Sequence, residues 1–132
     1  MKTEIITKPN SSFENIKHLN EIGQEYWSAR ELYKALDYLK WDKFLNVIDK
    51  AEIACKSSGY ERLDHFPRMK KMIELPKGTK RDIGDIHLSR YACYLIIQNA
   101  DPSKEVVALG QTYFAVQTRK HEITEKEFEI IS

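Results

Sequence analysis

Apolar residues recur at helical spacing over two stretches in the first half of the chain. Ser28 and Glu31 form a capping box, in which the Ser28 hydroxyl can accept the Glu31 amide and the Glu31 carboxylate can accept the Ser28 amide. A helix is therefore predicted to begin at Ser28. A second helix is predicted from Asp42 to Ser57 because apolar residues repeat there every three or four positions. The two short helices and the tight connection between them are typical of a helix-turn-helix-like unit.

Two further helices are predicted in the second half. Ser89 is a good N-cap for a helix that is apolar nearly all round through Ile97, and this helix is expected to lie at the centre of the core. Asp101 and Pro102 then suit the cap and first position of another helix. Its predicted packed stripe comprises Val106, Leu109, Tyr113, Phe114 and Val116 or Gln117, with helical character continuing through Ile130. Gly110 within this helix indicates a close helix contact.

Turn residues between extended segments predict two hairpins. The first joins Ile16–Leu19 to Gln24–Trp27 through a four-residue turn that contains Asn and Gly. The second joins Met69–Leu75 to Asp82–Leu88, with Pro and Gly in the segment between them. Together with the helices, these hairpins predict an α+β fold in which small antiparallel hairpins pack against about four helices.

The length of 132 residues and mass of 15.5 kDa fit one folded domain. Residues 1–12 are expected to form a flexible leader, 13–122 the domain, and 123–132 an acidic helical extension that ends at a possible truncation point. The longest apolar run is too short to cross a bilayer and no signal peptide is recognised, so we expect a cytoplasmic protein without membrane association.

The formal net charge of +1 hides a strongly uneven distribution. Between residues 68 and 81, six basic residues face the single acid Glu74: Arg68, Lys70, Lys71, Lys77, Lys80 and Arg81. From residue 122 onward the balance is acidic. A polyanion would therefore meet a polarised molecule, with its positive charge on the second hairpin.

Four sequence motifs together resemble one bacterial family. They are Trp27-Ser28-Ala29-Arg30-Glu31-Leu32, Ser89-Arg90-Tyr91-Ala92-Cys93-Tyr94-Leu95, Gln98-Asn99-x-Asp101-Pro102 and Gln111-Thr112-Tyr113-Phe114-Ala115-Val116-Gln117-Thr118-Arg119. In this order they resemble the DNA-damage-inducible protein D family. The front half is also similar to the N-terminal domain of the Bro-type antirepressors of phages and large DNA viruses. Relatives commonly carry Leu-Gly-Tyr where this chain has Leu36-Asp37-Tyr38, and Asp tolerates the left-handed conformation that Gly would adopt there.

The resemblance implies a Bro-N-like, DNA-binding domain that acts in the SOS response, and it brings no set of catalytic residues. Family members continue well past the end of this chain. We therefore expect a non-enzymatic DNA-binding domain of a DNA-damage or phage-type regulatory protein. Whether it prefers single- or double-stranded DNA stays open.

The residues themselves supply the candidate contacts. Lys77, Lys80 and Arg81, supported by Arg68, Lys70 and Lys71, suit DNA phosphates. In the predicted helical pair, Lys43 and Asn46 could meet base edges and Lys40 a phosphate, although an ordinary helical hairpin explains the same spacing. A solvated basic turn is the corresponding plain interpretation of the second hairpin.

Catalytic interpretations are weaker. Cys93 with His87 could form a thiolate–imidazole pair, but Cys93 lies in the most apolar helix, where burial raises the pKa of a thiol. Glu74 and Lys77 resemble a nuclease metal motif only with one residue too many between them. The histidines lack ligand spacing, so no metal and no cofactor are expected.

The alternative function is a protein-interaction module. Gln111, Thr118 and Arg119, on the polar stripe of the last helix, would then contact a partner together with the acidic end. That partner could be a second copy of the chain or a DNA-repair protein such as a recombinase filament. Salt separates the two functions, because counterion release makes only the DNA complex strongly salt-sensitive.

Overall fold

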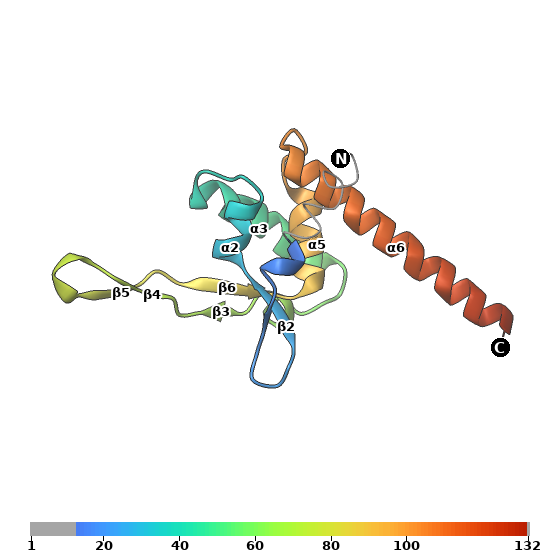
Figure 1. The fold of residues 1–132 in the computed structure, drawn as a ribbon, viewed down its shortest axis with the longest axis horizontal. Coiled ribbons are helices and arrows are strands. Elements are labelled where there is room, and N and C mark those ends of the chain that lie inside the picture. Colours follow the sequence, from blue (N-terminus) through green and yellow to red (C-terminus); the bar gives the residue numbers. More distant parts are fainter. Residues whose placement is uncertain (1–12, 132) are drawn as a thin grey trace.

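A four-stranded antiparallel sheet organises the chain, with the strand order β1-β2-β6-β3 (Figure 1). The computed structural model describes residues 13–131, and it describes side chains through residue 120 and that of residue 123. The strands of this sheet are β1 (His18–Leu19), β2 (Glu25–Ser28), β3 (Arg68–Met69) and β6 (Asp85–Leu88). The predicted α+β class is confirmed, whereas the expected leader at 1–12 lies outside the described residues.

The first predicted hairpin is present as β1 and β2. Asn20 closes its turn, since the Asn20 carbonyl accepts the Gly23 amide at 3.0 Å and the Asn20 side chain accepts the Ile22 and Gln24 amides. Gly23 has a φ of 82°, a conformation that costs glycine little. Trp27 of β2 points into the core and is fully buried.

The first helix begins where its capping pattern predicts, and the second begins one residue before the predicted Asp42, without a side-chain cap. Helix α2 (Ala29–Ala35) has Ser28 as its N-cap, whose hydroxyl accepts the Glu31 amide. The Glu31 carboxylate lies 2.5 Å from the His18 ring, so it does not complete the capping box as the sequence predicts. Helix α3 (Trp41–Ser57) follows, and the short helix α4 (Arg62–His65) comes after it.

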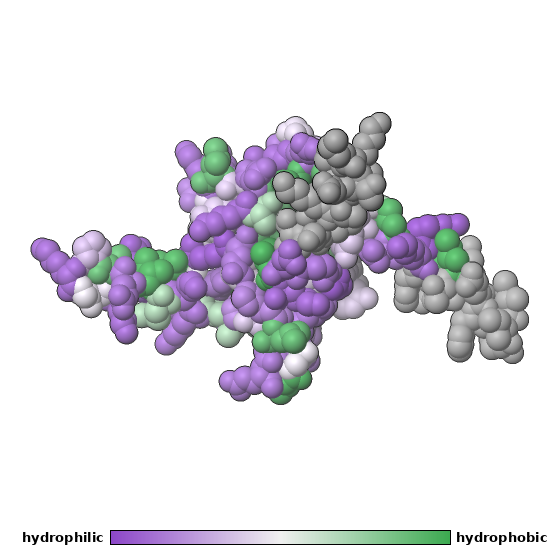
Figure 2. All heavy atoms as spheres, in the orientation of Figure 1, coloured by the Kyte–Doolittle hydropathy of each residue, from purple (hydrophilic) through white to green (hydrophobic). Residues whose placement is uncertain are grey.

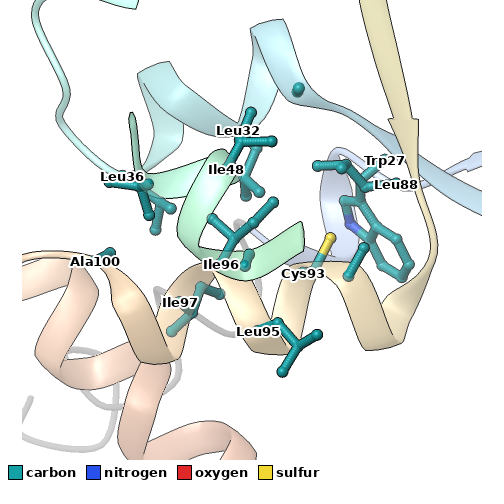
Figure 3. Close-up of a cluster of buried hydrophobic side chains, with 14 of the residues drawn as sticks. Trp27, Leu32, Leu36, Ile48, Leu88, Cys93, Leu95, Ile96, Ile97 and Ala100 are labelled. Atoms are coloured by element: carbon teal, nitrogen blue, oxygen red, sulfur yellow. The ribbon is translucent and has the colours of Figure 1, made fainter. Parts of the chain in front are cut away.

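Helix α5 (Arg90–Asn99) is the centre of the core, as predicted. Ser89 caps it by accepting the Ala92 amide at 3.0 Å. Helix α3 packs along α5, and Figure 3 shows Ile48 of α3 close to Ile96 and Cys93 of α5, with Trp27 and Leu88 of the sheet beside them. Ile48, Leu88, Cys93 and Ile96 have no exposed surface.

The last helix differs from its prediction at its start and in its buried stripe. Helix α6 (Glu105–Ile131) begins after Asp101 and Pro102, because the Asp101 carboxylate accepts the Ser103 amide and hydroxyl in a separate turn. Val107 and Phe114 are its buried side chains among residues 105–120, whereas Val116 is exposed. The buried stripe therefore starts at Val107, one residue after the predicted Val106, which is only half-buried.

Gly110 marks a close helix contact, as predicted. A Cβ placed at Gly110 would lie 3.3 Å from Cγ2 of Ile97 on α5. Phe114 still packs into the core, whereas residues 115–120 are exposed, and Figure 1 shows α6 extending away from the body on one side. The second predicted hairpin extends on the other side; we name its residues 68–86 the arm.

Candidate nucleic-acid interface

The arm is one continuous antiparallel ribbon. At its base Met69 pairs with Asp85, and toward its end β4 (Met72–Glu74) pairs with β5 (Lys80–Asp82). The Ile83 amide donates to the Lys71 carbonyl at 2.8 Å and so joins the two paired stretches. At about 3.3 Å per residue, the strand from Met69 to Leu75 is roughly 20 Å long.

The tip of the arm is a tight turn. The Leu75 amide donates to the Thr79 carbonyl at 2.7 Å, which leaves a three-residue loop, η1 (Pro76–Gly78). Within this loop Lys77 has a φ of 75° and Gly78 a φ of 79°. A left-handed conformation is favourable for glycine but costs a lysine energy, so Lys77 sits under backbone strain at the tip.

Cross-strand pairing divides the cations of the arm between two faces. Arg81 pairs with Ile73, and Lys80 pairs with Glu74. Paired residues share a face of the ribbon, so Lys80 lies beside a carboxylate whereas Arg81 lies beside an apolar side chain. Lys70, Lys71, Lys77, Lys80 and Arg81 are all exposed.

Arg68 differs from the other predicted phosphate contacts because the body of the molecule already holds it. Its guanidinium donates to the Glu52 carboxylate at 2.5 Å and to the Phe66 carbonyl at 2.9 Å. Glu52 is a buried residue of α3 that also accepts from Arg62 at 3.1 Å. Arg68 thus anchors the base of the arm.

A second anchor joins the arm to the start of α2. The buried Asp85 carboxylate accepts hydrogen bonds from the Ser28 hydroxyl, from the Arg30 amide at 3.1 Å and from the amide of the next residue, Ile86, at 2.7 Å. The Arg30 guanidinium donates to the carbonyls of Ile83 and Gly84, each at 2.6 Å, and packs over the Trp41 ring. Residues of the Trp27–Leu32 motif therefore fix the direction in which the arm leaves the body.

A cleft of about 660 Å³ lies between α2, the outer face of the sheet and the arm. Its basic lining comes from Arg30, Lys34, Lys70 and Lys71, and the rings of Tyr26 and His87 stack 4.2 Å apart on its sheet side. Burial lowers the pKa of His87 more than the neighbouring Asp85 raises it, so this imidazole is neutral near pH 7. Lys34 is an exposed residue of α2 that lines this cleft with residues of the arm, and the hydrophobic pattern of its helix does not indicate that neighbourhood.

The three candidate residues at the start of α3 lie apart from this cleft. Lys40, Lys43 and Asn46 are exposed, whereas the cleft is lined by residues of β1, β2, α2, the arm and β6. Helix α3 buries its opposite face against α5. The structure therefore brings Lys70 and Lys71 together with α2 but does not bring the α3 residues to the same place.

The predicted partner-binding residues are partly used within the chain. Gln111 donates to the Ile97 carbonyl at 3.0 Å and so satisfies a carbonyl near the end of α5. Thr118 donates to the Phe114 carbonyl at 2.9 Å within α6. Arg119 is exposed on the same helix. Gln111 is thus a residue of the α5–α6 packing.

Both cysteines are buried thiols. Complete burial holds the pKa of Cys93 well above its ordinary value, and burial with the nearby Glu52 carboxylate raises the pKa of Cys55. A neutral buried thiol is a poor nucleophile. Among the side chains that the structure describes, no group of three or more His, Cys, Asp or Glu is arranged to hold a metal ion. None of the helices in that range is long and apolar enough to cross a membrane.

Comparisons with known proteins identify the family of the chain. The BRO family N-terminal domain matches residues 15–115, and the chain belongs to this family. DNA damage-inducible protein D of Escherichia coli (strain K12) is 49% identical to it over 115 residues. That match covers 87% of this chain but 42% of the relative, so the chain spans less than half of the relative's length. No solved structure matches the chain. The predicted family is thereby confirmed.

Proposed function

We propose that this domain binds DNA without catalysing a reaction, as part of a regulatory protein of the DNA-damage or phage antirepressor type. The observation that carries the proposal is the arm, a two-stranded ribbon that projects from the body (Figure 1) and whose cations at 70, 71, 77, 80 and 81 are exposed. A two-stranded ribbon is narrow enough to enter a groove of duplex DNA. The family membership and the name of the E. coli relative support the regulatory role.

The cations of the arm are available for phosphates. Lys70, Lys71, Lys77, Lys80 and Arg81 form no ion pair with another residue of the described range. By contrast, Arg68 is paired with Glu52, and we assign it to holding the arm rather than the DNA. Each phosphate that the arm neutralises releases counterions, which makes the affinity strongly dependent on salt.

The first experiment is fluorescence anisotropy of labelled single- and double-stranded DNA, titrated at several salt concentrations. We expect binding whose logarithmic affinity falls with log salt at a slope of about −4, as for four to five contacted phosphates. The variant K77A/K80A/R81A should lose most of the affinity and flatten that slope by about 2 to 3. Circular dichroism checks that the variant is folded.

A charge-matched control separates the arm from a general effect of net charge. Lys50 and Lys56 are exposed lysines of α3 outside the cleft, so K50A/K56A is compared with K77A/K80A, each variant losing two lysines. We expect a large loss of affinity only in the arm variant. Equal losses would show that the arm has no special role, and undiminished binding in both would remove these cations from the interface.

A second candidate function is protein interaction through α6. The observation that favours it is the exposed apolar side chains Val116 and Ile123 on the part of this helix that leaves the body. Arg119 lies on the same side of the helix, three residues from Val116 and four from Ile123, whereas Thr118 lies on another side. A second copy of the chain or a repair protein such as a recombinase would be the partner. Sedimentation of the chain over a range of concentrations tests self-association, and V116K should abolish it.

A further inference from the structure

The arm carries apolar side chains that no core covers. Met72 is 52% exposed and Leu75 36% exposed, and Pro76 at the tip is exposed as well. Figure 2 shows hydrophobic residues among hydrophilic ones along the arm, away from the body. Exposed apolar surface at the end of a projecting basic ribbon is a candidate contact surface.

The side chains of the ribbon do not suit direct reading of bases in the major groove. One face carries Arg81 and Lys71 with Ile73 and Ile83, and the other carries Glu74 and Asp82 with Met72, Lys70 and Lys80. Direct readout uses Arg or Lys toward guanine and Asn or Gln toward adenine, and residues 68–86 contain no Asn or Gln. Here one face is largely apolar between its cations and the other includes two carboxylates, which DNA repels.

The tip has the shape and stiffness of a wedge. Pro76 has no backbone N–H to leave unpaired, and its ring fixes the backbone at the point of the turn. The Leu75–Thr79 hydrogen bond closes the loop directly behind it. Lys77 lies within the loop, Lys80 and Arg81 follow it in β5, and all three are exposed, so a duplex at the tip would meet three cations.

We propose, on the basis of the DNA-binding function above, that the tip of the arm enters the minor groove of duplex DNA and inserts Leu75 and Pro76 between neighbouring base pairs. Apolar wedges of this chemistry unstack a base step and kink the duplex by about 20–90°. The ligand is therefore double-stranded DNA, and flexible pyrimidine–purine steps should be preferred because they unstack at the lowest cost. The arm's length of roughly 20 Å exceeds the minor-groove depth of about 7.5 Å, so the body need not approach the groove.

The experiment measures bending and binding separately. A duplex of about 30 base pairs with a central TA step carries a donor and an acceptor at its ends, and the full chain is titrated while anisotropy and energy transfer are recorded. We expect energy transfer to rise with saturation, and 2-aminopurine placed beside the TA step to brighten as it unstacks. The L75A/P76A variant should retain the salt-dependent binding but lose at least half of the rise in energy transfer.

The control variant is L39A, because Leu39 is a 95% exposed leucine outside the arm. It should bend DNA as the unaltered chain does. Two outcomes would contradict insertion of Leu75 and Pro76 and leave the proposed function in place. One is DNA binding with no rise in energy transfer, and the other is a rise that L75A/P76A does not reduce. A preference for single-stranded DNA also overturns it. No binding to either DNA at low salt contradicts the proposed function itself.

Discussion

The body and the arm of this domain are built on opposite principles. In the body, the sheet, α3 and α5 enclose side chains such as Trp27, Ile48 and Ile96 that have no exposed surface. In the arm, between residues 70 and 82, only Ile73 is even half-buried, and the ribbon is held by its backbone ladder. The body thus supplies the stability, while the arm's side chains are free to be selected for contact with a ligand.

The largest expected effect comes from removing a core side chain. We expect W27A to lower the free energy of unfolding by about 3–5 kcal/mol, because it leaves a cavity in the core. M72A in the arm should change it by less than about 0.5 kcal/mol. Urea denaturation followed by circular dichroism measures both. A comparable loss in the two variants would mean that the arm is part of the cooperative core.

The junction between the two regions is the next place to test. D85A removes the acceptor of the Ser28 hydroxyl and of the Arg30 and Ile86 amides, so we expect a loss of about 1–3 kcal/mol from the buried donors left unpaired. Hydrogen exchange should also become faster in the arm near Ile83. The matched variant is D82A, whose exposed carboxylate accepts the Lys71 and Gly84 amides.

The two aspartates should differ in how far their effects extend. We expect D82A to speed exchange only within the arm and to leave the unfolding midpoint in place, because Asp82 lies outside the core. If D85A proved as mild as D82A, the anchoring role of the Ser28–Arg30–Asp85 network would be wrong.

Acid should weaken the body through two carboxylates that Arg90 contacts, Glu14 and Glu25. Burial raises the pKa of Glu14, but hydrogen bonds from Arg90 and Tyr113 outweigh it and lower that pKa overall. Hydrogen bonds from Arg90 also lower the pKa of Glu25. A carboxylate with a lowered folded-state pKa stabilises the fold above its ordinary value near 4.5, and the contribution disappears as the pH falls through the folded-state pKa.

We therefore expect the unfolding midpoint to fall as the pH drops below about 4.5, and R90M to reduce this dependence. Arg90 contacts Glu14 at 3.1 Å and Glu25 at 2.8 Å, so the variant removes the common partner of both. Thermal denaturation at several pH values measures the change. The same pH slope in R90M and in the unaltered chain would assign the acid sensitivity to other groups.

The sequence predicts the body better than it predicts the site. Caps at Ser28 and Ser89 placed two helices correctly because capping is local chemistry. The start of α6 was wrong because Asp101 caps its own turn instead of the helix. Pro76 and Gly78 predicted the turn of the arm, but the sequence did not predict which residues of α2 and α3 the arm contacts. Contacts such as Arg68 with Glu52 and Arg30 with Ile83 join residues far apart in the chain. The spacing of residues within one segment cannot predict such contacts.

The smallest expected effect compares two strained residues, one in each region. Asp37 and Lys77 both have positive φ angles, of 60° and 75°. Asp37 ends α2 in a Schellman motif, where the Asp37 amide donates to the Lys34 carbonyl and the Tyr38 amide to the Tyr33 carbonyl. Glycine relieves the strain at either position but loses more entropy on folding, for a net gain of about 0.5–1 kcal/mol.

Because α2 packs into the core and the arm does not, a glycine substitution should change global stability in α2 but only local stability in the arm. D37G should raise the global free energy of unfolding and leave DNA affinity unchanged. K77G should instead slow exchange of the Leu75 amide without moving the unfolding midpoint, and it should flatten the salt dependence of DNA binding by about one unit of slope. A rise in global stability from K77G would show that the arm unfolds together with the body. Unchanged salt dependence would show that a strained lysine at the tip contributes no phosphate contact.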